Sequence, residues 1–94
     1  MRLTHKEIDT IKNSVLSLDA DARIYLFGSR IDDAKRGGDI DLLIESSILT
    51  KQDLRKIRWQ FFGVFGEQKM DLVLDTGIEN QTFINMIKPT AVQL

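Results

Sequence analysis

Helix-start signals and short apolar runs alternate along this 94-residue chain, and the alternation limits the folds open to it. Thr4, Ser29 and Thr50 each precede an acidic residue by three positions. In this capping-box pattern, the hydroxyl and the carboxylate each satisfy a free backbone N–H at a helix start. We expect helices over about 4–18, from Ser29 for a short stretch, over about 50–66, and in a last segment carrying Phe83, Ile84 and Ile87 up to Pro89.

Three short runs rich in β-branched, aromatic and aliphatic residues separate the expected helices. They cover 23–27, 39–44 and 70–74, and glycine-containing turns adjoin them. The order helix–strand–helix–strand–helix–strand–helix predicts a mixed α/β (α+β) fold, with a small sheet of about three strands and about four flanking helices. The length fits a single domain over 1–94, with no room for a second one.

Composition excludes several classes of protein. At 43% hydrophobic and 29% charged residues the chain can build a core, and with no cysteine it cannot form disulfides or a cysteine-based zinc site. A formal charge of -1 argues against a dedicated nucleic-acid binder, which usually carries a basic excess. The apolar runs are too short to span a membrane and no export signal is evident, so we expect a cytoplasmic protein.

Acidic residues gather at the start of two expected strands. Asp39 and Asp41 are two apart on a strand, so their carboxylates project from one face. A helical crossover between the second and third strands makes these two parallel, which puts Asp71 at the same sheet end. An antiparallel first strand would bring the Gly28-Ser29 turn there as well. Carboxylate pairs bind Mg²⁺, and a glycine turn before a helix start admits phosphate, so the pattern indicates phosphoryl or nucleotidyl transfer.

At these residues the chain resembles a known family. Gly28-Ser29, nine intervening residues and then Asp39-Ile40-Asp41 resemble the signature of the DNA polymerase β-type nucleotidyltransferase superfamily, and Asp71 matches its third carboxylate. The small size resembles the minimal nucleotidyltransferases that prokaryotes encode beside a HEPN-domain toxin. The resemblance implies a polymerase β palm-like fold.

The resemblance also implies a mechanism and a partner. Asp39, Asp41 and Asp71 would bind metal, with two Mg²⁺ ions expected, and Asp71 would assist deprotonation of the acceptor hydroxyl. Gly28 and Ser29 would cradle the phosphates of the nucleotide, and Arg30 would contact them. The donor would be ATP. The acceptor would be a tyrosine hydroxyl of the HEPN-domain toxin, with which the chain would form a hetero-oligomer as its antitoxin.

Two alternatives stay open at this point. Asp32 and Asp33 add negative charge near the expected phosphates, which favours a non-catalytic antitoxin that neutralises its partner by masking it. A nucleotidyltransferase acting on a small molecule or on RNA is the other alternative.

Helix 50–66 has two features outside its main apolar stripe. Lys51, Arg55, Lys56 and Arg58 form a basic face that we expect to be solvated. Trp59 and Phe62 lie off the apolar stripe, and we expect them either to extend the core or to bind a partner.

Overall fold

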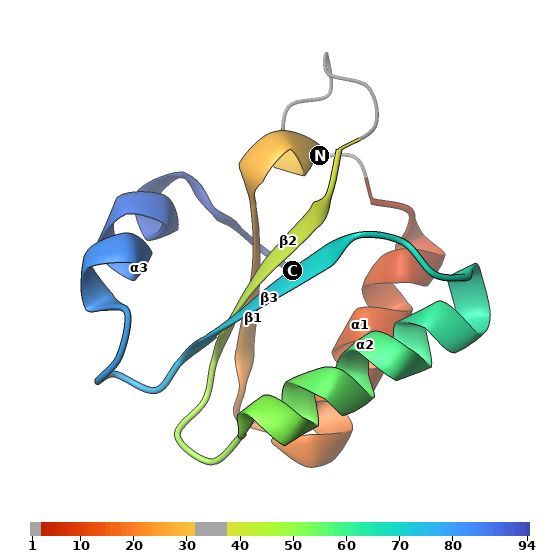
Figure 1. Cartoon of the computed structure of the whole chain (residues 1–94), viewed down its shortest axis with the longest axis horizontal. Coiled ribbons are helices and arrows are strands. Elements are labelled where there is room, and N and C mark those ends of the chain that lie inside the picture. The colour runs from red at the N-terminus through yellow and green to blue at the C-terminus, as the bar shows by residue number, and fades with distance from the viewer. Residues whose placement is uncertain (1–2, 32–37) are drawn as a thin grey trace.

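The computed structural model describes residues 3–31 and 38–94, and its elements follow the predicted alternation (Figure 1). The elements are α1 (His5–Leu18), β1 (Arg23–Phe27), the 3₁₀ helix η1 (Gly28–Ile31), β2 (Ile40–Glu45), α2 (Lys51–Phe65), β3 (Met70–Asp75), α3 (Gln81–Ile87), the 3₁₀ helix η2 (Lys88–Thr90) and β4 (Val92–Gln93). The mixed α/β class is confirmed.

Four strands form one mixed sheet in the described part of the chain, in the order β3-β2-β1-β4. Strand β1 pairs antiparallel with β2 and with β4, whereas β2 and β3 are parallel. The parallel pair follows from the crossover through α2, because a helical connection returns the chain to the same end of the sheet. Both predicted pairings, β1 with β2 and β2 with β3, are therefore confirmed.

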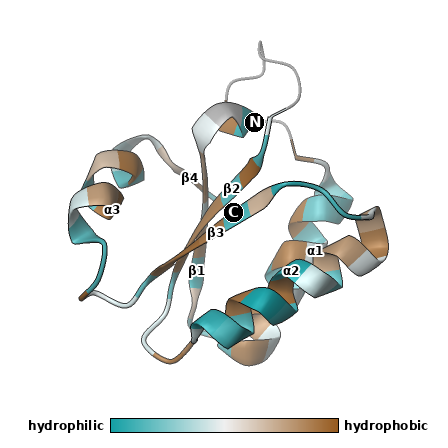
Figure 2. Ribbon diagram, viewed as in Figure 1, coloured by the Kyte–Doolittle hydropathy of each residue, from teal (hydrophilic) through white to brown (hydrophobic). Residues whose placement is uncertain are grey.

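Helices α1 and α2 cover one face of the sheet, and α3 lies on the other side (Figure 1). The main core lies under α1 and α2; its most buried members include Ile11, Val15, Ile24, Leu26, Leu42, Ile44, Ile57 and Phe61. Figure 2 shows hydrophobic residues along the middle of the strands and a hydrophilic start of α2. The sheet therefore has a thickly covered face and a second face that α3 covers only in part.

Local signals explain where the two long helices begin and end. Thr4 and Thr50 each form the complete capping box, with the threonine hydroxyl accepting from the N–H of Glu7 and Asp53 respectively. Helix α2 ends at Gly66, which takes a positive φ of 84°. Both boundaries of α2 match the prediction.

The elements differ slightly in kind and number from the expectation. The short helix expected from Ser29 is the single 3₁₀ turn η1, which begins at Gly28; Asp32, the acidic residue of that predicted capping box, lies outside the described residues. Strand β4 was not predicted, because two residues are too few to show a strand period. It pairs Val92 with Leu26 and so adds a short fourth strand beside β1.

A second, smaller apolar contact joins helix α3 to strand β1. Ile84 is 1% exposed, and the ring of Phe83 meets that of Phe27 edge-on with centroids 6.0 Å apart.

In the described part of the chain, no helix combines the length and the apolarity that crossing a bilayer requires.

The two aromatic residues off the α2 stripe have different environments. Phe62 packs against the core at partial burial, whereas 73% of Trp59 is exposed. The expectation of a core role is correct in part for Phe62 and wrong for Trp59, because the sheet and α1 cover only the side of α2 that carries Ile57 and Phe61.

Candidate active site

Three carboxylates meet at one end of the sheet, where β2 and β3 begin. Asp39 immediately precedes β2, Asp41 is its second residue, and Asp71 is the register partner of Asp41 on β3. One carboxylate oxygen from each of the three lies within 4.8 Å of the others. The crossover argument therefore predicted their convergence correctly. We call these three residues the acidic triad.

The acidic triad lies on the sheet face opposite α1 and α2. Ile40 and Leu42, the neighbours of Asp41 on β2, are buried in the main core, and side chains alternate between the two faces of a strand. Asp41 therefore points away from α1 and α2. Asp39 and Asp41 are half-buried and Asp71 is exposed, which leaves the carboxylates accessible to a ligand from solvent.

The turn after β1 packs directly against the central carboxylate of the acidic triad. Phe27, the last residue of β1, is the register partner of Asp41, so Gly28 follows at the same sheet end, as predicted. Gly28 has a positive φ of 77°, and a Cβ atom there would overlap Oδ2 of Asp41 and lie 3.2 Å from its Cγ. Glycine is required at this position both by the backbone conformation and by the space.

The remaining residues predicted to contact phosphate are in η1. Ser29 belongs to the same 3₁₀ turn as Gly28. Arg30 is half-buried, and its Nε donates to the carbonyl oxygen of Gly38 at 3.3 Å. This bond joins η1 to the residue preceding Asp39, so Arg30 borders the acidic triad. Asp32 and Asp33, along with Lys35 and Arg36, lie outside the described residues.

The clustered negative charge changes the acidity of Asp41. Its pKa is raised to about 6, first because burial disfavours the charged form, then because the negative charge of Asp71 and a hydrogen bond with it favour the protonated form. Asp39 adds to the repulsion, and the positive charge of Lys69 partly opposes it. A cation between the carboxylates would offset this repulsion.

Lys69 is a site residue that the sequence reasoning missed. Its Nζ lies 3.3 Å from Oδ2 of Asp39, and its carbonyl oxygen accepts from the N–H of Ile40 at 3.2 Å. The sequence offered one indication of this role, its position: Lys69 immediately precedes β3 and so lies at the same end of the sheet as Asp71. A lysine in a connection is too common to single out without that geometry.

The donor set fits a hard divalent cation. Mg²⁺ prefers carboxylate oxygens and is usually bound by one or two carboxylates together with substrate phosphates. The acidic triad supplies three such groups close together. Burial raises the pKa of Asp41 first, and the repulsion from Asp71 and Asp39 raises it further than the positive charge of Lys69 lowers it. Asp39, Asp41 and Asp71 can therefore hold Mg²⁺.

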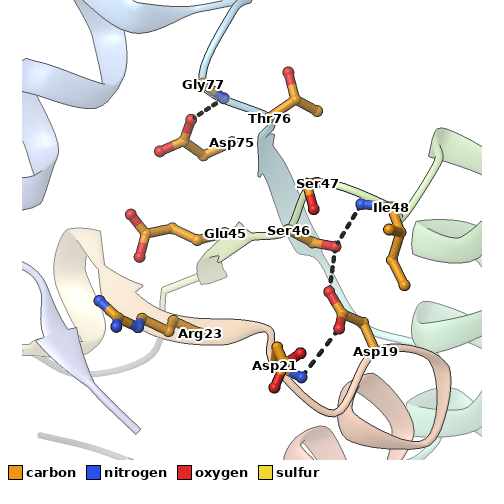
Figure 3. A pocket seen from close by; sticks show the side chains of 10 residues that line it. All are labelled: Asp19, Asp21, Arg23, Glu45, Ser46, Ser47, Ile48, Asp75, Thr76 and Gly77. Atoms are coloured by element: carbon orange, nitrogen blue, oxygen red, sulfur yellow. Dashed lines mark hydrogen bonds between the residues drawn. The ribbon is translucent and has the colours of Figure 1, made fainter.

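A cavity of about 400 Å³ lies at the opposite end of the sheet, beyond the end of β2 (Figure 3). Its lining includes the acidic side chains of Asp19, Glu45 and Asp75. These have local partners: Asp19 accepts from the Ser46 hydroxyl at 2.6 Å, Asp75 accepts from the N–H of Gly77, and Glu45 pairs with Lys88. This cavity is therefore separate from the acidic triad, and its carboxylates help to order the surrounding loops.

Comparison with known families agrees with the geometry. A family model described as a nucleotidyltransferase domain matches residues 8–92. The match spans both Gly28-Ser29 and the acidic triad, and the chain belongs to this family of nucleotidyltransferase domains. A search of curated proteins finds no match. Domains of this family generally use Mg²⁺ and a nucleoside triphosphate, which is the chemistry that the donor set fits.

Proposed function

We propose that this chain is a Mg²⁺-dependent nucleotidyltransferase that transfers AMP from ATP to a hydroxyl group of a protein partner. The observation that carries the proposal is the convergence of the acidic triad beside the close-packed turn at Gly28, within a nucleotidyltransferase domain. Because the reaction consumes ATP, we also propose that the protein acts in the cytoplasm.

In the proposed reaction the acceptor oxygen bonds to the α-phosphorus of ATP. The bond from that phosphorus to the bridging oxygen breaks, pyrophosphate leaves, and the hydroxyl proton passes to a carboxylate. Asp71 suits the last role because it is the most accessible member of the acidic triad. Mg²⁺, of which two ions are proposed, would neutralise phosphate charge and stabilise the attacking and leaving oxygens when held by Asp39, Asp41 and Asp71.

The turn at η1 would bind the phosphates. Gly28 lets the backbone lie against Asp41 without a side chain in between, so backbone N–H groups of the turn can approach an anion closely. Arg30 borders the acidic triad through its bond to Gly38 and supplies a fixed positive charge. Ser29 is proposed to contribute through its place in the turn.

The accessibility of the acidic triad favours an acceptor on another protein. Within the described residues Asp71 is exposed, so a side chain of a second protein can reach it. Helix α2 also presents Trp59, 73% exposed, and Val64, 52% exposed, which are suited to binding a protein partner. We propose that this partner is a HEPN-domain toxin, which the chain would neutralise as its antitoxin.

These exposed apolar residues also favour a second candidate function, neutralisation by masking without transfer. The Asp39→Asn/Asp41→Asn double variant separates the two. Under the proposal, this variant still binds the HEPN-domain partner but neither neutralises it nor transfers label from ATP. Full neutralisation by the variant would show that masking is sufficient and would contradict the proposal. Asp9→Asn, an exposed carboxylate on α1, is the matched control and retains both activities.

A further inference from the structure

The acidic triad carries its own cation. The ammonium group of Lys69 lies 3.3 Å from Oδ2 of Asp39, close enough for its charge also to favour ionisation of Asp41. Three carboxylates and one ammonium leave an excess of two negative charges. Lys69 is thus a partial substitute for the divalent cation that the site fits.

The attachment of Lys69 differs between its backbone and its side chain. The carbonyl oxygen accepts from the N–H of Ile40 at 3.2 Å, which fixes the residue at the start of the parallel pair β2 and β3. The side chain is 74% exposed and its ion pair with Asp39 is of the exposed kind, worth little energy. The ammonium group can therefore move away from Asp39 while the backbone of Lys69 stays beside the acidic triad.

Metal binding and the ion pair compete for the same carboxylate. Once a divalent cation is bound to Asp39, the ion pair between Asp39 and the Lys69 ammonium is weakened, because the two cations repel each other. The freed ammonium has three N–H donors, and within the described residues Asp39 is the only carboxylate with which it forms an ion pair. The anionic groups that arrive with the metal are the phosphates of the nucleotide, and lysine binds phosphate readily as a point charge.

We propose that Lys69 is a phosphate ligand for the nucleotide, which Asp39 holds at the site until a divalent cation displaces it. This inference rests on the proposed function. Arg30 borders the acidic triad from η1 and Lys69 borders it from the start of β3. Two cations on separate elements would then contact the triphosphate, with the carboxylates between them.

The proposal predicts opposite effects on two affinities when Lys69 is replaced by methionine. Without its competitor, Mn²⁺ alone should bind about two- to fivefold more tightly, the range that an exposed ion pair is worth. In saturating Mg²⁺, the non-transferable analogue α,β-methylene-ATP should bind about tenfold more weakly, because a charged hydrogen bond to phosphate is lost. Lys69→Arg should keep the analogue affinity within about threefold of the wild type.

The measurement is electron paramagnetic resonance for free Mn²⁺ and calorimetry for the analogue, on the full chain. Lys56→Met is the matched control, since Lys56 forms a similarly exposed ion pair with Asp53 on α2 and should change neither affinity. Unchanged Mn²⁺ affinity in Lys69→Met overturns the competition, and unchanged analogue affinity overturns the phosphate contact. If the wild type binds neither probe, the proposed function itself fails.

Discussion

Gly28 and Asp41 fit against each other only because residue 28 has no side chain, since a Cβ atom there would overlap Oδ2 of Asp41. The turn that is proposed to bind phosphate and the carboxylate that is proposed to bind metal are therefore in direct contact. A change in one of these elements must displace the other, which makes the pair a sensitive test of the site.

Comparing alanine at Gly28 with alanine at Gly77 should separate the effect on the acidic triad from the cost of backbone strain. Alanine at a positive φ costs about 1–2 kcal/mol of stability, and at Gly28 it also pushes the Asp41 carboxylate out of the acidic triad. We expect Gly28→Ala to lower the melting temperature and to abolish Mn²⁺ binding. Gly77→Ala is the control: its φ is 85° but an added Cβ has nothing within 4 Å, so it should lose stability and keep the metal.

The pKa of Asp41 predicts how stability depends on pH in the absence of metal. Folding raises this pKa from 3.8 to about 6, so the folded state holds the proton more tightly than the unfolded state. The resulting stabilisation is complete below about pH 4 and is lost as the pH rises through about 6. Chemical denaturation at pH 5 and pH 7.5 should show a larger loss of stability for the wild type than for Asp41→Asn.

Metal should reverse this loss, because a bound cation offsets the negative charge of the ionised Asp41. Saturating Mg²⁺ at pH 7.5 should raise the melting temperature of the wild type and leave that of Asp41→Asn nearly unchanged. An equal rise in the melting temperature of both proteins would show that Mg²⁺ binds at a site that does not include Asp41.

The start of α2 should matter for stability and not for the site. Thr50 accepts from the N–H of Asp53, whose carboxylate accepts in turn from the N–H of Thr50 at 2.9 Å. Thr50→Ala removes the threonine half of this capping box and should cost about 1 kcal/mol of unfolding free energy in urea titrations. Mn²⁺ affinity should not change; a weaker affinity would show that α2 helps to position the acidic triad.

Trp59 should contribute to partner binding and hardly to folding. At 73% exposure its replacement by serine should change the unfolding free energy by no more than about 0.5 kcal/mol, whereas Phe61→Ala, at 1% exposure, should cost about 3–5 kcal/mol. If α2 is the docking surface, Trp59→Ser should weaken capture of the proposed HEPN-domain partner at least tenfold. Unchanged capture would exclude Trp59 from the interface.

The parts of the fold that local chemistry determines were predicted from the sequence. The capping boxes at Thr4 and Thr50 depend on residues three positions apart, and both form. The meeting of Asp41 with Asp71 involves distant residues, yet it follows from one general rule, that a helical crossover joins parallel strands.

What the sequence left undetermined depends on contacts without a local signal. The pairing of Lys69 with Asp39 joins an exposed and a half-buried side chain from different connections. The hydrophobic period of neither segment predicts this ion pair. Strand β4 is too short for a pattern, and its pairing with β1 depends on where the chain returns after η2. The exposure of Trp59 depends on how much of α2 the rest of the protein covers, which helical spacing alone does not determine.

The most direct test of the proposed transfer uses ATP labelled on either the α- or the γ-phosphate. Each form is incubated with Mg²⁺, this chain and a HEPN-domain protein, the proposed partner, and label on that protein is measured. We predict label from the α-phosphate only, release of one pyrophosphate for each AMP attached, and no label with Asp39→Asn/Asp41→Asn. Label from the γ-phosphate, or no label on the partner from the wild type, would contradict nucleotidyl transfer to this partner.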